Sequence, residues 1–380
     1  MSKVPKIHVW MPDIFQFKGG IQVYGAFFIQ ALEQILPNSD RHIFLKHDAK
    51  ATDSLHFNPQ TQFQFAGGWK SSFLHTPIFA FQVFFAALQQ RPDLIICGHV
   101  NFSPLALHIF KWLKTPYWVV VYGIDVWNLK DVSKISALKA AQKIVSIGEY
   151  TRDRIVKEQK ISSESIYLLP VTFDASQFVI QPKPQYLLDR YQFKFDQPII
   201  LTVTRLASEN SYKGYDQIIQ SLPAIRRQIP NIHYLLVGKG DDRERIEAMV
   251  KSTDVCDCVT LAGFVSDNEL ADHYNLCDVF AMPSKGEGFG IVYLEALACG
   301  KPTIGGDQDG AIDALCHGEL GVLINPDDVE ELGETIIQIL QGKYSLPILY
   351  QPEMLRQKVI QIYGFDRFKQ TLSQLFTNQF

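Results

Sequence analysis

Short apolar runs of the buried-strand type alternate with helical segments in two separate series, and this alternation constrains the fold more than any other feature. Apolar runs without polar alternation are typical of parallel strands that helices cover on both faces. The predicted strands are 6–10, 93–97, 117–122 and 143–147 in the first series, and 198–203, 231–237, 259–262, 278–282 and 302–304 in the second. The pattern predicts an α/β protein with two doubly wound domains facing each other across a cleft.

Length and charge agree with two globular domains of different character. The chain has 380 residues, which exceeds what one hydrophobic core usually holds, and 47% of them are hydrophobic. Residues 1–176 carry 18 basic and 13 acidic side chains, whereas residues 177–380 carry 18 and 27. The first half is therefore the one expected to meet an anionic surface, and no nucleic-acid partner is predicted.

A glycine-rich loop and a helix start fall together in residues 283–305. The loop 285–290 lets the backbone approach a ligand closely, and the helix predicted from Ile291 to Ala298 places free N–H groups beside it. Glu295 occupies the apolar stripe of this helix, where a carboxylate is costly unless something pairs with it. Ligand hydroxyls could donate to Glu295; alternatively, Glu295 lies at the edge of the stripe and reaches water.

Two cations are predicted at the same edge of the second sheet. Arg205 follows the first strand of the second series, and Lys213 precedes the next helix. Because carboxyl ends of parallel strands meet at one edge, both side chains are expected near the loop 285–290. Two cations and a helix N-terminus predict a pyrophosphate site.

The first series ends its strands in polar residues too. Gly19 and Gly20 follow the first strand and open a helix, an arrangement that can cradle phosphate but is also found in simple turns. His99 follows strand 93–97 and is a candidate ligand contact, although a single histidine is often structural. The dinucleotide fingerprint G-x-G-x-x-G is absent, which disfavours a dehydrogenase.

Residues 69–88 are dense in phenylalanine. The bland interpretation is core packing against the sheet, and the alternative is an amphipathic face resting on a membrane. The longest nearly apolar run, 77–88, is too short to span a bilayer. Six cysteines without metal-ligand spacing, and an N-terminus without a signal pattern, predict reduced thiols in the cytoplasm.

These motifs together resemble family 4 of the retaining glycosyltransferases, which has the GT-B architecture. The resemblance is carried by Glu287 and Glu295 in EGFGIVYLE, by TRL and YKG with Arg205 and Lys213, and by the segments 261–265 and 299–304. It is close over residues 198–325 and looser in the first half. It implies two Rossmann-like domains: 1–174, joined by a C-terminal helix 365–380, on the acceptor side, and 175–364 for the nucleotide sugar.

The resemblance also implies a role for each matched residue. Arg205 and Lys213 correspond to the pair that neutralises the leaving diphosphate, Glu295 to the ribose ligand, and Glu287 to the ligand of the transferred sugar. The catalytic residues implied are Arg205, Lys213, Glu287 and His99. The donor-binding residues implied are Gly19, Gly20, Arg205, Lys213, Gly238, Gly263, Phe264, Val265, Glu287, Gly288, Phe289, Gly290, Ile291, Val292 and Glu295.

The chain departs from the family pattern in places. Tyr122 stands where the family often has a donor-contacting histidine, which leaves His99 as a candidate substitute. Asp309-Gly310 and Asp313 stand where Gly-Gly and Glu are common. Asp307-Gln308-Asp309 mimics the D-x-D of metal-dependent transferases, and we interpret it as a chance match because two cations already serve the diphosphate. No metal and no cofactor are predicted.

The predicted function is retaining transfer of a hexose, with UDP-glucose as the favoured donor, to a polysaccharide precursor or a lipid-linked glycan. Polysaccharide biosynthesis in the cytoplasm is expected, with peripheral contact at the inner face of the plasma membrane. Two alternatives stay open. One is a nucleotide-sugar epimerase or phosphorylase on the same fold, and the other is a sugar-nucleotide-binding subunit without catalysis.

Overall fold

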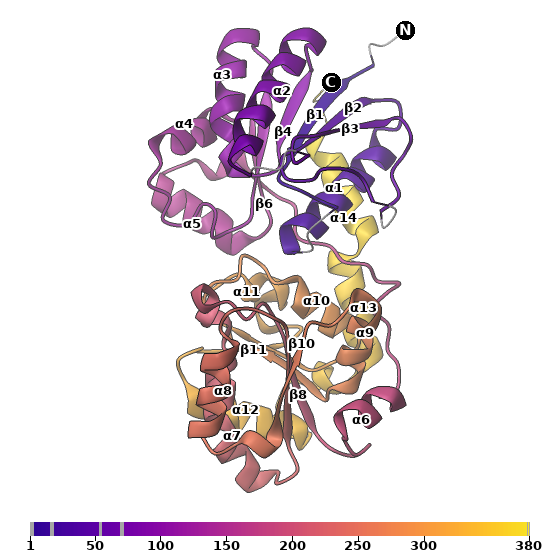
Figure 1. Ribbon diagram of the computed structural model, residues 1–380, viewed down its shortest axis with the longest axis vertical. Coiled ribbons are helices and arrows are strands. Elements are labelled where there is room, and N and C mark those ends of the chain that lie inside the picture. Colours follow the sequence, from indigo (N-terminus) through magenta and orange to yellow (C-terminus); the bar gives the residue numbers. More distant parts are fainter. Residues whose placement is uncertain (1–3, 16–18, 53–54, 69–71, 378, 380) are drawn as a thin grey trace. The chain divides into compact units, whose positions relative to one another are not determined.

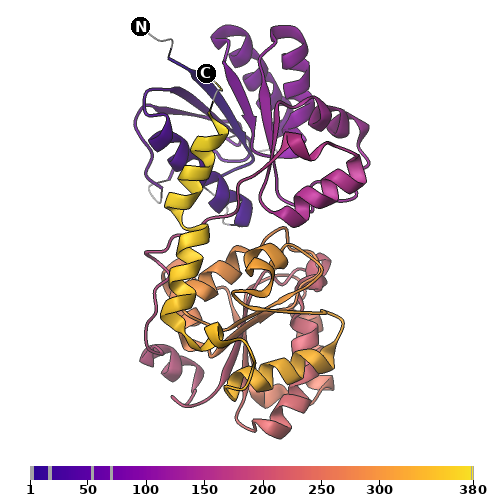
Figure 2. The same ribbon diagram turned by 180° about the vertical axis from the view of Figure 1, so that it is seen from behind.

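The computed structural model describes residues 4–15, 19–52, 55–68, 72–377 and 379 (Figures 1 and 2). The described chain forms two compact units, the first from residues 1–172 with 365–380 and the second from 173–364. Lys18 of the predicted glycine loop and residues 69–71 of the predicted aromatic helix lie outside the described residues. Within the described residues, no helix is long and apolar enough to cross a membrane.

The first unit is a parallel sheet of seven strands in the order β3-β2-β1-β4-β5-β6-β7. Its strands are β1 (Lys6–Met11), β2 (Asp40–Leu45), β3 (Thr61–Phe65), β4 (Leu94–Cys97), β5 (Tyr117–Val121), β6 (Lys143–Ser146) and β7 (Ile166–Leu168). Its helices are α1 (Gly20–Ile35), α2 (His75–Gln90), α3 (Ser103–Leu113), α4 (Val132–Ala140), α5 (Glu149–Gln159) and α14 (Phe365–Leu375). Every residue of β4 and β5 is buried, as expected for parallel strands covered on both faces.

The four strands predicted for this unit occur, but β2, β3 and β7 were not predicted. β2 could not be recognised as a strand from its sequence, DRHIFL, because the sequence places an arginine and a histidine inside the sheet. Arg41 is fully buried, and its guanidinium donates to the carbonyl oxygens of Leu36 and Ser39 and to the hydroxyl oxygen of Thr61. These hydrogen bonds make the burial of a charged group tolerable.

The last helix of the chain, α14, belongs to the first unit and packs on α1. The ring of Phe368 lies 5.5 Å from that of Tyr24, and the ring of Phe376 lies 4.6 Å from that of Trp118. The ammonium of Lys143 donates to the carbonyl oxygen of Leu375 at 2.6 Å. The C-terminal residues therefore complete the cover of this sheet.

The second unit is a parallel sheet of six strands in the order β10-β9-β8-β11-β12-β13. Its strands are β8 (Ile199–Val203), β9 (His233–Val237), β10 (Val259–Gly263), β11 (Val279–Met282), β12 (Thr303–Gly306) and β13 (Val322–Ile324). Its helices are α6 (Gln185–Tyr191), α7 (Tyr215–Gln228), α8 (Arg243–Ser252), α9 (Asp267–Leu276), α10 (Ile291–Ala298), α11 (Ala311–Ala314), α12 (Val329–Leu340) and α13 (Pro352–Tyr363). The five predicted strands occur; α6 adds a helix to the segment 173–197, which the sequence had suggested was only a connection.

Each unit has a topological switch point, where consecutive strands turn to opposite sides of the first strand. In the second unit it lies between β8 and β11, which pair in parallel, and in the first unit between β1 and β4. Ligands of open α/β sheets bind at the carboxyl ends of the strands beside such a point. The prediction of two doubly wound α/β domains is confirmed, and the switch points are where candidate sites are sought.

Candidate active site

The strongest candidate site lies at the switch point of the second unit. Lys213 ends the short helix η4 (Ser208–Lys213) after β8, and Glu287 lies in the loop after β11. Their side chains form an ion pair, and they are only 12% and 17% exposed. Burial lowers the pKa of Lys213, but the charge and hydrogen bond of Glu287 outweigh this effect, so the net pKa of Lys213 is raised. The lysine is therefore charged at neutral pH.

The two loops that carry this pair are in close contact. The N–H of Lys285 donates to the carbonyl oxygen of Tyr212 at 2.9 Å. Gly214 adopts φ +85°, and a Cβ at this position would lie 2.3 Å from the carbonyl oxygen of Pro283. Only glycine allows this conformation and this approach, so the glycine of YKG has a direct structural reason.

Asp309 fixes the loop that carries Glu287. It is fully buried after β12, and its Oδ2 accepts the hydroxyl of Ser284 at 2.6 Å and the N–H of Glu287 at 2.7 Å. Its Oδ1 accepts the N–H of Ala311 at 2.9 Å. Burial raises the pKa of Asp309 to about 7, against the lowering effect of these three donors. Sequence reasoning missed this role, because it considered Asp309 only as part of a chance D-x-D and as a departure from the family's Gly-Gly.

Glu295 is buried on α10, with 8% of its surface exposed, so the alternative that it reaches water at the helix edge is wrong. The hydroxyl of Tyr274, on α9, donates to its Oε2 at 2.7 Å. Burial raises the pKa of Glu295 to about 7, and the hydrogen bond from Tyr274 opposes that shift. α10 begins after Gly290, so the N–H groups of Ile291 and Val292 belong to the helix N-terminus. Together these groups can bind an anion and hydroxyls.

Arg205 is exposed and lies on the segment that follows β8. The backbone next to Arg205 forms hydrogen bonds with the loop between β9 and α8. The N–H of Leu206 donates to the carbonyl oxygen of Lys239 at 3.1 Å, and the N–H of Asp242 donates to that of Leu206 at 3.0 Å. Backbone hydrogen bonds thus hold Leu206, the residue that follows the exposed Arg205.

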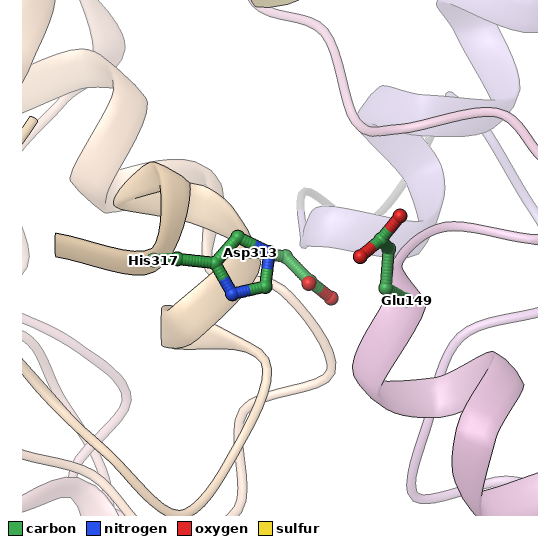
Figure 3. A group of neighbouring side chains, drawn as sticks. All are labelled: Glu149, Asp313 and His317. Carbon is green, nitrogen blue, oxygen red and sulfur yellow. The ribbon is translucent and has the colours of Figure 1, made fainter. Parts of the chain in front are cut away.

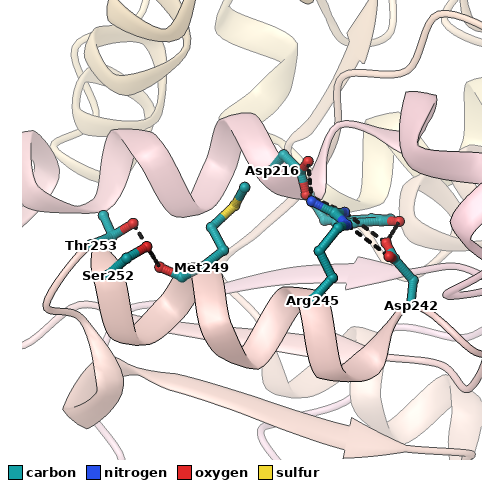
Figure 4. A network of polar contacts seen from close by, with 7 residues as sticks. Asp216, Asp242, Arg245, Met249, Ser252 and Thr253 are labelled. Carbon is teal, nitrogen blue, oxygen red and sulfur yellow. Dashed lines mark hydrogen bonds and ion pairs between the residues drawn. The ribbon is translucent and has the colours of Figure 1, made fainter.

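A network of charged side chains connects α7 and α8 (Figure 4). The guanidinium of Arg245 on α8 donates to both carboxylate oxygens of Asp216 on α7, at 2.8 and 2.9 Å. It also donates to both oxygens of Asp242, at 2.7 and 2.6 Å, and Tyr215 adds its hydroxyl to Asp242. The network joins the start of α7, directly after Lys213, to the start of α8.

The predicted donor-binding residues Gly238, Gly263, Phe264 and Val265 lie at the carboxyl ends of β9 and β10. The N–H of Gly238 donates to the carbonyl oxygen of Gly263 at 2.8 Å, which joins the two loops. Phe264 is 68% exposed, and the ammonium of Lys239 lies 4.8 Å from the centre of its ring; Val265 is half-buried. An exposed aromatic ring with a cation beside it can stack on a nucleobase.

In the first unit, His99 follows β4 and Gly19 caps the helix α1 after β1, so both lie at the switch point of that sheet. Gly20 is the first residue of α1. Burial lowers the pKa of His99 to about 4, so its ring is neutral at pH 7. The ring of His99 stacks on that of Tyr122 with centroids 6.3 Å apart. His99 therefore lies beside the position where the family's histidine is missing.

Two buried oxygens next to His99 stand out. Among the described residues, neither Oη of Tyr122 nor Oδ2 of Asp125 has a hydrogen-bond partner. The other oxygen of Asp125 accepts the N–H of Tyr122 at 2.9 Å, and burial raises the pKa of Asp125 to about 6. Unsatisfied buried polar atoms at the carboxyl edge of a sheet are expected where a polar ligand binds.

The two aspartates of Asp307-Gln308-Asp309 lie in different surroundings. Asp307 is exposed, whereas Asp309 is buried and accepts three hydrogen bonds, so the two do not form a D-x-D pair. Figure 3 draws the side chains of Glu149, Asp313 and His317, all of residue types that can bind a metal ion. Glu149 belongs to the first unit and the others to the second, so neither unit supplies this set of ligands.

Comparison with protein families identifies the second unit. The model of "Glycosyl transferases group 1" matches residues 188–357, which all lie within 173–364. The second unit belongs to the group 1 glycosyl transferases. This assignment confirms the resemblance that EGFGIVYLE and the Arg205 and Lys213 segments carry.

Relatives and solved structures extend the comparison. A "GDP-mannose-dependent alpha-(1-6)-phosphatidylinositol monomannoside mannosyltransferase" of Mycolicibacterium smegmatis is 28% identical over 230 residues, which are 58% of this chain and 59% of that protein. Sucrose-phosphate synthase of Thermosynechococcus elongatus has TM-score 0.79 at 20% identity, covering 99% of this chain and 98% of that one. HepE of Anabaena, in complex with UDP-glucose, has TM-score 0.78 at 16% identity, covering 98% and 99%. The two solved structures share the fold of this chain, which confirms the GT-B prediction.

In this unit Lys213 pairs with Glu287, and Glu295 lies on α10, the helix that follows the loop of Glu287. Asp309, Ser284 and Tyr274 were missed. Asp309 had one usable signal, an acidic residue directly after a buried strand, while Tyr274 reaches Glu295 from another helix and gives no local sign.

Proposed function

We propose that this chain is a retaining glycosyltransferase that moves a hexose from a nucleoside-diphosphate sugar to a polysaccharide precursor or a lipid-linked glycan. The observation that carries the proposal is the buried ion pair of Lys213 and Glu287 at the switch point, beside the N-terminus of α10. A charged lysine, a carboxylate and free helix N–H groups are what a diphosphate and sugar hydroxyls require.

The proposed chemistry follows from these groups. As the glycosidic bond breaks, negative charge gathers on the leaving diphosphate, and Lys213, Arg205 and the start of α10 stabilise it. Glu287 pairs with Lys213 in the structure. A bound donor takes over the ammonium and leaves the carboxylate to accept hydroxyls of the sugar. The acceptor attacks from the face that the diphosphate leaves, so the proposed mechanism needs no nucleophile from the protein.

Two donors are proposed in order. UDP-glucose is the donor favoured by the sequence, and HepE, a structural neighbour, was crystallised with that compound. GDP-mannose is the second candidate, because the names of several curated relatives state dependence on it. Phe264 can stack on either base, so the ring does not distinguish them.

A panel of nucleotide sugars tests the proposal. The purified chain is incubated with UDP-glucose, UDP-galactose, GDP-mannose and GDP-glucose, with glycan acceptors, and the product is followed by NMR. A product whose anomeric configuration matches that of the donor supports retaining transfer. Inverted configuration contradicts the mechanism. An epimerised nucleotide sugar without acceptor supports the epimerase alternative, and tight donor binding without any product supports the non-catalytic subunit.

Replacement of the two glutamates is expected to have different effects on nucleotide binding and on sugar transfer. Glu295→Ala should weaken binding of free UDP or GDP, because Glu295 is assigned to the ribose hydroxyls. Glu287→Ala should spare free nucleotide and impair sugar transfer, because Glu287 is assigned to the hexose. Calorimetry with the free nucleotides, combined with turnover of the whole donor, measures both effects. An equal loss of free-nucleotide affinity in the two variants would show that the roles are misassigned.

We propose that the enzyme works in the cytoplasm and reaches a lipid-linked acceptor at the membrane surface by peripheral contact. The support is the charge asymmetry, an excess of five basic side chains in residues 1–176. Polysaccharide biosynthesis is the process that fits such an acceptor.

A further inference from the structure

Helices α2 and α3 lie side by side on the first unit (Figure 1). α2 precedes β4 and α3 precedes β5, and these strands pair in parallel, so the two helices run in the same direction. Their inner faces bury Phe79, Val83, Ala106 and Ile109 against the sheet. The rings of Phe84 and Trp112, with centroids 6.1 Å apart, join the helices on the outer side.

The outer side of this helix pair exposes large aromatic side chains. Phe73 is 75% exposed, Phe81 62%, Phe85 43% and Trp112 73%. The rings of Phe81 and Phe85 lie 4.2 Å apart, and Phe85 contacts Phe84. We call these four residues, together with Phe84, the aromatic face. Exposing a contiguous set of aromatic rings to water costs free energy. Such a set therefore marks a surface that binds a partner.

The charged side chains on and at the ends of α2 and α3 have one sign. The sequence contains no Asp or Glu from 54 to 92 or from 98 to 124, whereas Arg91, Lys111 and Lys114 are exposed. Arg91 and Lys114 cap the C-terminal ends of α2 and α3, and since the helices are parallel, both cations lie at the same end as Trp112. Asp93, the first acidic residue after α2 in the sequence, accepts the N–H of Lys6 in the sheet.

We propose that the aromatic face docks on an anionic lipid surface. Aromatic rings, tryptophan above all, insert at the boundary between headgroups and acyl chains, and exposed lysines beside them attract anionic headgroups. Helices of 16 and 11 residues lie in that boundary and do not cross it. This inference deepens the proposed function and rests on it for the reason a membrane is visited, which is a lipid-linked acceptor.

Vesicle flotation of the full chain tests the docking. The vesicles contain phosphatidylcholine alone or with phosphatidylglycerol, at low salt. We expect the chain to float with the anionic vesicles. Lys111→Gln with Lys114→Gln should weaken partitioning about fivefold per lysine. Phe81→Ser with Trp112→Ser should weaken it by at least about tenfold, because the apolar side chains no longer enter the boundary.

Matched controls sit outside the aromatic face. Phe195→Ser removes a ring that is 69% exposed in the second unit, and Lys139→Gln removes an exposed lysine of α4; both should leave flotation unchanged. Wild-type flotation that the lysine and aromatic variants do not weaken overturns the proposal. So does the absence of vesicle binding, and so does a shift from dimer to monomer in the aromatic variant, which would show that a second copy covers the face.

Failure of docking and failure of the proposed function have different signatures. Docking fails when flotation is lost while transfer to a water-soluble glycan acceptor continues. The proposed function fails when no donor in the panel reacts, whether or not the chain floats. Unfolding midpoints of all variants, measured beside wild type, separate lost docking from lost structure, and the lysine variant carries the test where the aromatic variant does not fold.

Discussion

Lys213→Ala is expected to lower turnover by about 100- to 1,000-fold, or roughly 3 kcal/mol in barrier height, because it removes a positioned cation from the leaving diphosphate. Arg205→Ala should act in the same direction. The side chain of Lys213 is only 12% exposed and pairs with Glu287, so its position is fixed before the donor arrives. Steady-state kinetics on the donor identified by the panel measure the effect.

Lys285→Ala is the matched control. Lys285 lies in the same loop as Glu287, pairs with Asp327 at the surface and is 34% exposed. Its loss should leave turnover within about twofold of wild type, since exposed ion pairs contribute little. Lys213→Arg should recover part of the activity because it keeps the charge. Unchanged turnover in Lys213→Ala and Arg205→Ala, with wild-type unfolding midpoints, would refute the phosphate site.

Asp309→Ala is expected to destabilise the second unit by about 3 kcal/mol and to abolish transfer. Three buried donors, the hydroxyl of Ser284 and the N–H groups of Glu287 and Ala311, lose their acceptor, and each unsatisfied group costs about 1–3 kcal/mol unless water enters. The loop that carries Glu287 then loses its anchor. Urea unfolding and turnover together measure the two effects.

Asp307→Ala is the control for this variant. Asp307 is two residues away, exposed on the same loop, so its removal should change neither stability nor turnover. Assays with EDTA complete the comparison, because activity should persist if Lys213, Arg205 and α10 meet the diphosphate charge. Activity that EDTA abolishes and manganese restores, together with a loss in Asp307→Ala, would assign a metal to this loop. Wild-type stability in Asp309→Ala would contradict its anchoring role.

The strands that could be predicted are those whose burial shows in the sequence itself. β5, with the sequence YWVVV, is apolar at every position, and such a short continuous apolar run indicates a buried strand. β2 could not be predicted because Arg41 is satisfied by groups that only the folded chain brings near it. β7 has three residues, which is too short for a period to be recognised.

The site divides in the same way. Lys213 and Glu287 follow buried strands, so their meeting at one edge can be derived from the general geometry of parallel sheets. The anchoring by Asp309 depends on which strands are neighbours: β12 pairs with β11, and this register brings Asp309 under the loop of Glu287. Two alternatives were open for residues 69–88, core packing and a membrane-facing surface. The helix buries Phe79 in the core and exposes Phe81, and the membrane contact stays a prediction.

The assignment of α14 to the first unit has a consequence for how the chain is made. A ribosome delivers residues 173–364 before the sixteen residues that cover Tyr24 and Trp118. The second unit can therefore close its core while synthesis continues, whereas the first must wait for residues 365–380, which reverses the usual order in which domains mature. An early stop codon after Gly364 would leave an intact second unit attached to an unfinished partner.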